Sequence, residues 1–336
     1  MRRDRLALLV AGSGCASSRF APSTNVSAGE RLFDGLPCHR PKLLKWGPAK
    51  LRQKQPSCYH WLLRNARRSF RSRQAEFTVS AAAVLERTFK LLDAFPPSAF
   101  SNATALAELV CRLGLNDEVL RQFPSELVPY YGTGLHMMQY PTQLGRYLAF
   151  LATSPVPVRR YVEIGARWGG TFIAVAEVLR RTQQGALEAV AAVDPMGESP
   201  LLKAYSERLQ RIAPRVAYSF LQQYSTDEPF KATLRRLAPT LVFIDGDHSY
   251  KAALSDHLLA ESAGAKLIAH HDIVSDCCES RRVWQELRAE ATRKGSTVAE
   301  FDEQYSGVRG RWLGIGVVHR SSADRMRSRK GLSVTA

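Results

Sequence analysis

The sequence contains no run of about 18 apolar residues, the length that a membrane-spanning helix needs, so we expect no membrane span. It also lacks a CxxC pair and any Cys/His spacing typical of zinc sites, although it contains 6 cysteines. This pattern fits a reducing compartment, with the cytoplasm as the default location. The adjacent Cys277 and Cys278 could form a redox or metal element, but vicinal cysteines more often reflect local packing.

Acidic residues are scarce at both ends of the chain. Residues 1–75 contain 16 Lys/Arg against 3 acidic residues, a net +13, and residues 320–336 contain 5 against 1, a net +4. The remaining 26 basic and 27 acidic residues nearly cancel, so the net charge of +16 belongs to the ends. A basic arm can attract phosphate or anionic lipid. We therefore do not expect nucleic acid to be the partner of the charge-balanced body.

The first 75 residues are rich in Arg, Ser and Pro and show no sustained periodicity. The apolar stretch Leu6–Val10 is too short for a convincing signal peptide, whereas an Arg-rich, acid-poor leader suits an organellar transit peptide. A disordered basic extension or a misassigned start codon explains the segment equally well. We expect residues 1–75 to be dispensable for any reaction that the chain catalyses. A shortened chain that starts near Glu76 should then bind the same ligand as the full chain. Residues 321–336 are expected to form a basic tail.

Residues 76–153 show a helical period. Apolar residues recur every three or four positions from Ala81 to Leu92, and Asn102 is placed to cap a second helix that stops at Gly114. Pro141 is expected to begin a third helix, because proline is favoured in the first turn. These helices are predicted to form a cap ahead of the domain that follows.

From residue 154 to 320 short buried strands replace the long helical period. Strands are predicted at residues 161–164, 189–193, 216–221, 241–244, 266–269, 297–301 and 312–318. Helices are predicted at residues 172–179, around 234, at 251–263 and around 283–287. The alternation predicts an α/β fold with a doubly wound, mostly parallel sheet. The last two strands lie close in sequence, so we expect an antiparallel hairpin at the sheet edge.

A glycine-rich turn follows the first of these strands. Gly165 and Gly169 would let the backbone approach a ligand closely, with a helix N-terminus behind it. A dinucleotide fingerprint needs glycine where Arg167 stands, and Glu163 at the strand tip would repel a diphosphate. A cationic or hydroxyl-bearing ligand suits this turn better. The next strand ends at Asp194, which could accept hydrogen bonds from ribose hydroxyls or cap the following turn.

Two clusters of acidic residues and histidines each follow a buried strand. They are Asp245-Gly246-Asp247-His248 and His270-His271-Asp272. If the two strands are neighbours, their ends lie about 4.8 Å apart, so Asp245 and Asp272 could hold one Mg²⁺ between them. His248 is then placed to take a proton from a substrate on that metal. Without a metal, Asp247 would be the acidic partner of His248.

Together these segments resemble class I S-adenosylmethionine (SAM)-dependent methyltransferases, and most closely the small-molecule O-methyltransferase branch with the macrocin-type and cephalosporin-hydroxylase-type proteins. The similarity spans about residues 135–319. It is carried by Gln139–Gln143, Tyr161–Thr171, Asp194-Pro195, Ile244–Tyr250 and His271–Ile273. The resemblance implies a Rossmann-like methyltransferase sheet, SAM as the cofactor and a small-molecule hydroxyl as the acceptor.

The resemblance also implies roles for the cofactor-binding positions. Glu163, Gly165 and Gly169 would form the first SAM-binding motif. Asp194 would hold the ribose, and Ser225 would lie near the adenine.

The resemblance further implies a metal-assisted reaction. Asp245, His271 and Asp272 would be the candidate metal-binding residues, with Mg²⁺ as the metal and His248 as the base. His271 stands where metal-dependent relatives often have a carboxylate, so the third ligand departs from their pattern. Metal coordination would lower the pKa of a hydroxyl, and the base would complete its deprotonation. The remaining catalysis would be alignment of the oxygen with the methyl group.

Three other functions stay open at this point. Methylation of a nucleic-acid base is disfavoured because no Asp/Asn-Pro-Pro-aromatic element follows the fourth strand, but ribose methylation is not. An NAD-dependent oxidoreductase is disfavoured by Arg167 and Glu163. A non-catalytic SAM-fold interaction protein is disfavoured by the intact acid and histidine clusters. Calorimetry with SAM, NAD⁺ and RNA would separate these functions.

Overall fold

The computed structural model describes residues 81–117, 124–183 and 185–320. The expectations for the basic arm and the basic tail therefore lie outside the described residues. Within these ranges, no helix combines the length and the apolar character that crossing a membrane requires.

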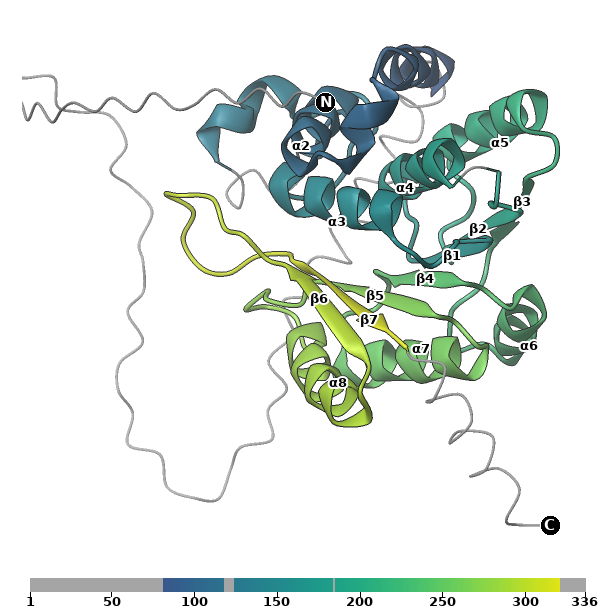
Figure 1. Ribbon diagram of the computed structural model, residues 1–336, viewed down its shortest axis with the longest axis vertical. Coiled ribbons are helices and arrows are strands. Elements are labelled where there is room, and N and C mark those ends of the chain that lie inside the picture. Colours follow the sequence, from purple (N-terminus) through teal and green to yellow (C-terminus); the bar gives the residue numbers. More distant parts are fainter. Residues whose placement is uncertain (1–80, 118–123, 184, 321–336) are drawn as a thin grey trace, which may run out of the picture. The chain divides into compact units, whose positions relative to one another are not determined.

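A seven-stranded sheet forms the centre of the fold, in the order β3-β2-β1-β4-β5-β7-β6 (Figure 1). Its strands are β1 Arg160–Ile164, β2 Ala189–Val193, β3 Ala217–Leu221, β4 Leu241–Ile244, β5 Leu267–His271, β6 Thr297–Phe301 and β7 Ile315–His319. The first five strands run parallel, and β7 is antiparallel to both β5 and β6. The predicted doubly wound, Rossmann-like α/β fold with an antiparallel C-terminal hairpin is thus confirmed.

Helices cover both faces of the sheet. Those on one face are α2 Ala103–Leu113, α3 Pro141–Thr153, α4 Gly170–Thr182 and α5 Pro200–Ile212, and those on the other are α6 Glu228–Leu237, α7 Tyr250–Ser262 and α8 Ser280–Lys294 (Figure 1). Residues 81–93 are also helical, and two short 3-10 helices lie at Pro97–Ser101 and Ser125–Tyr130.

Helix α2 begins and ends where the sequence predicts, and α3 begins at the predicted Pro141. The Asn102 side chain accepts a hydrogen bond from the Ala105 N–H at 3.1 Å and so caps α2, and Gly114 ends it. Gly145 in α3 allows the close contact of these two helices, because a Cβ there would lie 2.6 Å from the Ala107 nitrogen. The helices α2 and α3 share one hydrophobic core with the sheet.

The sequence-based prediction omits helix α5, which forms the crossover between β2 and β3. Its signals are present in the chain: Ser199 caps the Leu202 N–H, and Pro200 is the first helical residue. Tyr205 and Leu209 lie on its buried face. Two neighbouring parallel strands need a crossover connection. The predicted succession of two parallel strands therefore already required this helix.

Strand β5 ends two residues later than predicted, because it continues from Ala269 to His271. His270 and His271 therefore belong to the strand, and alternation along a strand turns their side chains to opposite faces. The buried His270 Nε2 lies 2.9 Å from Nδ1 of His257 on α7. The prediction that His270 belongs to the polar cluster beyond the strand is wrong.

The register of the sheet places the remaining polar residues. Phe243 faces the larger core under α2–α5, and Ile244 faces the core under α6 and α7. Because Ile244 pairs with His270, the next residues, Asp245 and His271, come side by side on neighbouring strands. Alternation puts both on the face of the larger core.

Candidate active site

The candidate site lies at the carboxyl ends of the parallel strands, where the strand order reverses between β1 and β4. Ligands bind in the crevice at such a switch point. Gly165 after β1 has a φ of 90°, and a Cβ at this position would clash with the carbonyl group of Asp245 after β4. The glycine turn and the loop after β4 are therefore in direct contact.

The glycine turn ends at Gly169, which is the N-cap of α4 and also has a φ of 90°. Asp194 holds the turn, because its Oδ2 accepts the Arg167 N–H and its Oδ1 accepts the Met196 N–H, both at 2.8 Å. The capping role considered for Asp194 is thus present. Burial raises the pKa of this carboxyl, although the two backbone hydrogen bonds lower it. Each oxygen can accept a further hydrogen bond.

Glu163 is almost fully buried, with 1% of its surface exposed. The Tyr161 hydroxyl donates a hydrogen bond to it. Burial raises the pKa of the Glu163 carboxyl well above its ordinary value, and the charge of Asp245 adds to this effect. A ligand in the crevice can reach little of this side chain directly.

Ser225 lies in the loop after β3 and interacts with Asp256 of α7. The Asp256 Oδ2 would lie 3.9 Å from a Cβ built on Gly246, so the loops after β3 and β4 meet above this carboxyl. Asp256 is 1% exposed, and burial raises its pKa to about 7. No local sequence signal distinguishes Asp256 from a solvated helix residue.

We expect Asp256→Asn to stabilise the protein, and to do so more at high pH. Folding raises the pKa of the Asp256 carboxyl from 3.8 to about 7. The free energy of unfolding therefore falls as the pH rises through that interval. At about 1.4 kcal/mol per pKa unit, the gain should reach about 4 kcal/mol at pH 8 and be clearly smaller at pH 5. Urea unfolding at the two pH values measures it.

The matched control is Asp93→Asn, because Asp93 is exposed and pairs with Arg181 at the surface. This change should alter the free energy of unfolding by less than about 1 kcal/mol at either pH. A gain from Asp256→Asn that is equal at both pH values would contradict the titration of Asp256.

Asp245, His248, His271 and Asp272 form one group, which we call the acid–histidine cluster. His271 Nδ1 lies 2.8 Å from Asp245 Oδ1 and 3.3 Å from Asp272 Oδ2. His248 Nδ1 lies 3.4 Å from Asp272 Oδ2, and its Nε2 lies 3.8 Å from Asp245 Oδ1. The structure thus brings together four residues that the sequence placed in two separate loops.

The charges of the cluster compensate one another. Burial alone lowers the pKa of His271, but the charges of Asp245 and Asp272 outweigh it and hold this pKa well above its ordinary value. Burial alone raises the pKa of Asp272, but His271 and His248 hold it below its ordinary value. A protonated His271 therefore bridges the two carboxylates.

Asp272 has a left-handed backbone, with a φ of 57°. This conformation costs a non-glycine residue about 1–3 kcal/mol, and such strain gathers at functional sites. The Ser275 hydroxyl donates to Asp272 Oδ1, and the Ser280 hydroxyl donates to its carbonyl oxygen at 3.3 Å. The Ser280 N–H also donates to the carbonyl oxygen of His248 at 3.1 Å. Ser280, which sequence reasoning missed, therefore ties the loops after β4 and β5 together.

Asp247 shapes the turn beside the cluster. Its side chain is exposed, and its Oδ1 accepts the Ser249 N–H at 2.9 Å. Ser249 in turn caps α7 by accepting the Ala252 N–H. The carboxylates of Asp245 and Asp272 lie beside His248.

No family model and no curated protein sequence matches the chain. Some solved structures are similar to the chain, at low sequence identity. The O-methyltransferase TomG from Streptomyces achromogenes, involved in tomaymycin synthesis, is 16% identical with a TM-score of 0.38, and the match covers 65% of this chain and 96% of TomG. The methyltransferase domain of bacterial CtHen1 is 11% identical with a TM-score of 0.34, and the match covers 53% of this chain and 97% of that domain.

Spermidine synthase from Thermotoga maritima is 12% identical with a TM-score of 0.31, and the match covers 51% of this chain and 56% of that enzyme. TM-scores and identities this low assign no function to the chain. Its function is therefore argued from its own site.

Proposed function

We propose that the chain transfers the methyl group of SAM to a hydroxyl group of a small molecule. The observation that carries the proposal is the juxtaposition at the β1–β4 switch point. There the glycine turn, held by Asp194, touches the loop that carries the acid–histidine cluster. A cofactor bound over the turn would place its reactive group beside that cluster.

The charge of the crevice suits SAM better than a nicotinamide dinucleotide. Asp194, Asp245 and Asp272 are acidic groups at the ends of three strands of one sheet. Carboxylates attract the sulfonium and ammonium groups of SAM and repel a diphosphate. Asp194 keeps acceptor capacity for ribose hydroxyls on both oxygens.

The cluster also has donors for a divalent cation. Ligand atoms of Asp245, His271 and Asp272 all lie within 4.8 Å of one another. The two carboxylates suit Mg²⁺, whereas the His271 imidazole is a less usual donor for it. Protonated His271 and a cation would compete for the same position between the carboxylates. When bound, Mg²⁺ would make the acceptor hydroxyl more acidic.

His248 is the group proposed to take the proton. The methyl carbon moves from the sulfonium sulfur to the acceptor oxygen, the hydroxyl proton passes to His248, and the products are a methyl ether and S-adenosylhomocysteine. Asp272, 3.4 Å from His248 Nδ1, would stabilise the imidazolium that forms.

Calorimetry with SAM, NAD⁺ and RNA tests the cofactor. We expect SAM to bind and Asp194→Ala to weaken its binding at least about 10-fold, because each charged hydrogen bond contributes about 1.5–3 kcal/mol. Asp247→Ala removes an exposed acid of the same edge and should leave SAM binding unchanged. Binding of NAD⁺ or RNA without SAM would overturn the proposal.

Removal of metal tests the role of Mg²⁺ separately. Methyl transfer should cease in excess chelator and return on addition of Mg²⁺. In Asp245→Asn and in Asp272→Asn, addition of Mg²⁺ after chelation should no longer change the rate of methyl transfer. Asparagine tolerates the left-handed backbone at position 272. Full turnover in chelator would remove Mg²⁺ from the proposal while leaving SAM in place.

A further inference from the structure

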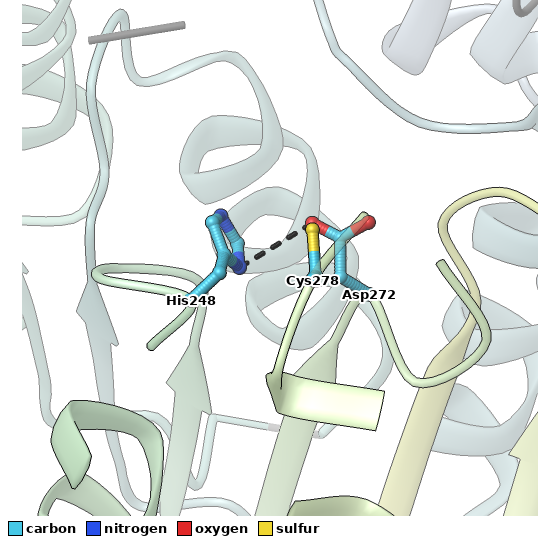
Figure 2. Close-up of side chains that lie close together, drawn as sticks. All are labelled: His248, Asp272 and Cys278. Carbon is cyan, nitrogen blue, oxygen red and sulfur yellow. Dashed lines mark ion pairs between the residues drawn. The ribbon is translucent and has the colours of Figure 1, made fainter. Parts of the chain in front are cut away.

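The loop between β5 and α8 returns to the acid–histidine cluster and brings a thiol to it. Ligand atoms of His248, Asp272 and Cys278 all lie within 4.8 Å of one another. Figure 2 shows the three side chains grouped together, with the ion pair between His248 Nδ1 and Asp272 Oδ2, 3.4 Å apart, as a dashed line. Tetrahedral zinc with bonds of about 2.0–2.3 Å holds its ligand atoms about 3.3–3.8 Å apart. The imidazole and the carboxylate already have this spacing.

Hydrogen bonds from Ser275, Cys278 and Ser280 hold these three residues in place. Ser280 binds the carbonyl oxygens of both His248 and Asp272. The Cys278 N–H donates to the Ser275 carbonyl at 3.3 Å, and the Ser275 hydroxyl donates to Asp272. Little rearrangement is therefore needed to close the three donors around an ion.

The donor types select a different metal from the one proposed for catalysis. One imidazole, one carboxylate and one thiolate are ligands typical of Zn²⁺, and three protein ligands leave a fourth position open. The set of Asp245, His271 and Asp272 offers two hard carboxylate oxygens and no sulfur. Asp272 belongs to both sets, so the two ions would compete for it.

We propose that His248, Asp272 and Cys278 form a Zn²⁺ site, and that Zn²⁺ bound there inhibits the chain. Binding releases the Cys278 thiol proton to solvent, because the thiolate is the ligand. A ligated His248 nitrogen is no longer available to take the proton of the acceptor. The inhibition rests on the proposed function, whereas the site itself does not.

Co²⁺ is the probe for the site, because a cobalt–thiolate bond gives a charge-transfer absorption in the near ultraviolet. The full chain should show this absorption at one equivalent of Co²⁺, and Zn²⁺ should displace it. Cys278→Ser should remove this absorption. Loss of an outer-shell partner weakens metal binding about 10–100-fold, and loss of the Cys278 ligand should weaken Zn²⁺ binding by more than that. Circular dichroism checks that the variant is folded.

The matched control is Cys277→Ser, which removes the neighbouring thiol, whose sulfur lies 3.7 Å from that of Cys278. It should keep the cobalt absorption. The combined change of Cys15, Cys38 and Cys58 to serine should keep it as well. His248→Ala should weaken Co²⁺ binding while Cys278 stays in place, which provides a second test if Cys278→Ser does not fold.

The outcomes separate the site from the proposed function. Absence of the absorption in the full chain, its survival in Cys278→Ser, or its loss in Cys277→Ser would each overturn the Zn²⁺ site. Cobalt binding without SAM binding would leave the site standing and remove the proposed function. In a methyl-transfer assay, Zn²⁺ should inhibit Cys277→Ser as strongly as it inhibits the unchanged chain. It should inhibit Cys278→Ser much less. Equal inhibition of the two variants would overturn the inhibitory role of the site.

Discussion

Replacement of His248 by alanine should lower turnover about 10²–10⁴-fold, the usual cost of losing a general base. SAM binding and Mg²⁺ binding should stay unchanged, because Asp194, Asp245 and Asp272 remain. Steady-state kinetics measure this loss, and added imidazole should restore part of the turnover.

Asp247→Ser is the control for His248→Ala. Serine keeps an oxygen that can accept the Ser249 N–H, so the turn should persist. Turnover should stay within about 3-fold, well short of the loss expected for a base. Unchanged turnover in His248→Ala would show that another group takes the proton.

Replacement of Gly165 by alanine should destabilise the fold and abolish SAM binding together. A Cβ at this position clashes with the Asp245 carbonyl group, and the φ of 90° is unfavourable for alanine. The backbone conformation costs about 1–2 kcal/mol, and overpacking adds about 1–3 kcal/mol. Urea unfolding and calorimetry with SAM measure the two effects.

Gly264 provides the matched control, because its φ of 86° is nearly the same and a Cβ there would meet nothing within 4 Å. Gly264→Ala should therefore show only the backbone cost and bind SAM normally. Equal destabilisation by the two substitutions would mean that the contact between the glycine turn and the loop after β4 contributes nothing.

Local patterns in the sequence predict most of the elements. Some bounds could be predicted closely because they depend only on neighbouring residues. Examples are the caps of α2, the proline that begins α3 and the strands β2, β4 and β6. The end of β5 was placed too early, because His270 and His271 look polar in sequence although both are buried. Burial of a polar residue depends on partners such as His257, which are distant in the chain.

The candidate site is predictable only in part, for the same reason. Asp245, His248, His271 and Asp272 could be found because each lies at or beyond the end of a buried strand. Their mutual arrangement could not, because it depends on pairing of β4 with β5 and on the left-handed turn at Asp272. Ser280 and Cys278 contact the cluster through a loop whose path no periodicity describes.

The position of Ser280 has a mechanical consequence. It is the first residue of α8, and it binds the backbones that carry both His248 and Asp272. A displacement of α8 would thus carry the histidine and the carboxylate along as one piece, rather than pull them apart. The spacing between these two groups is coupled to a 15-residue helix instead of to the stiffness of two separate loops.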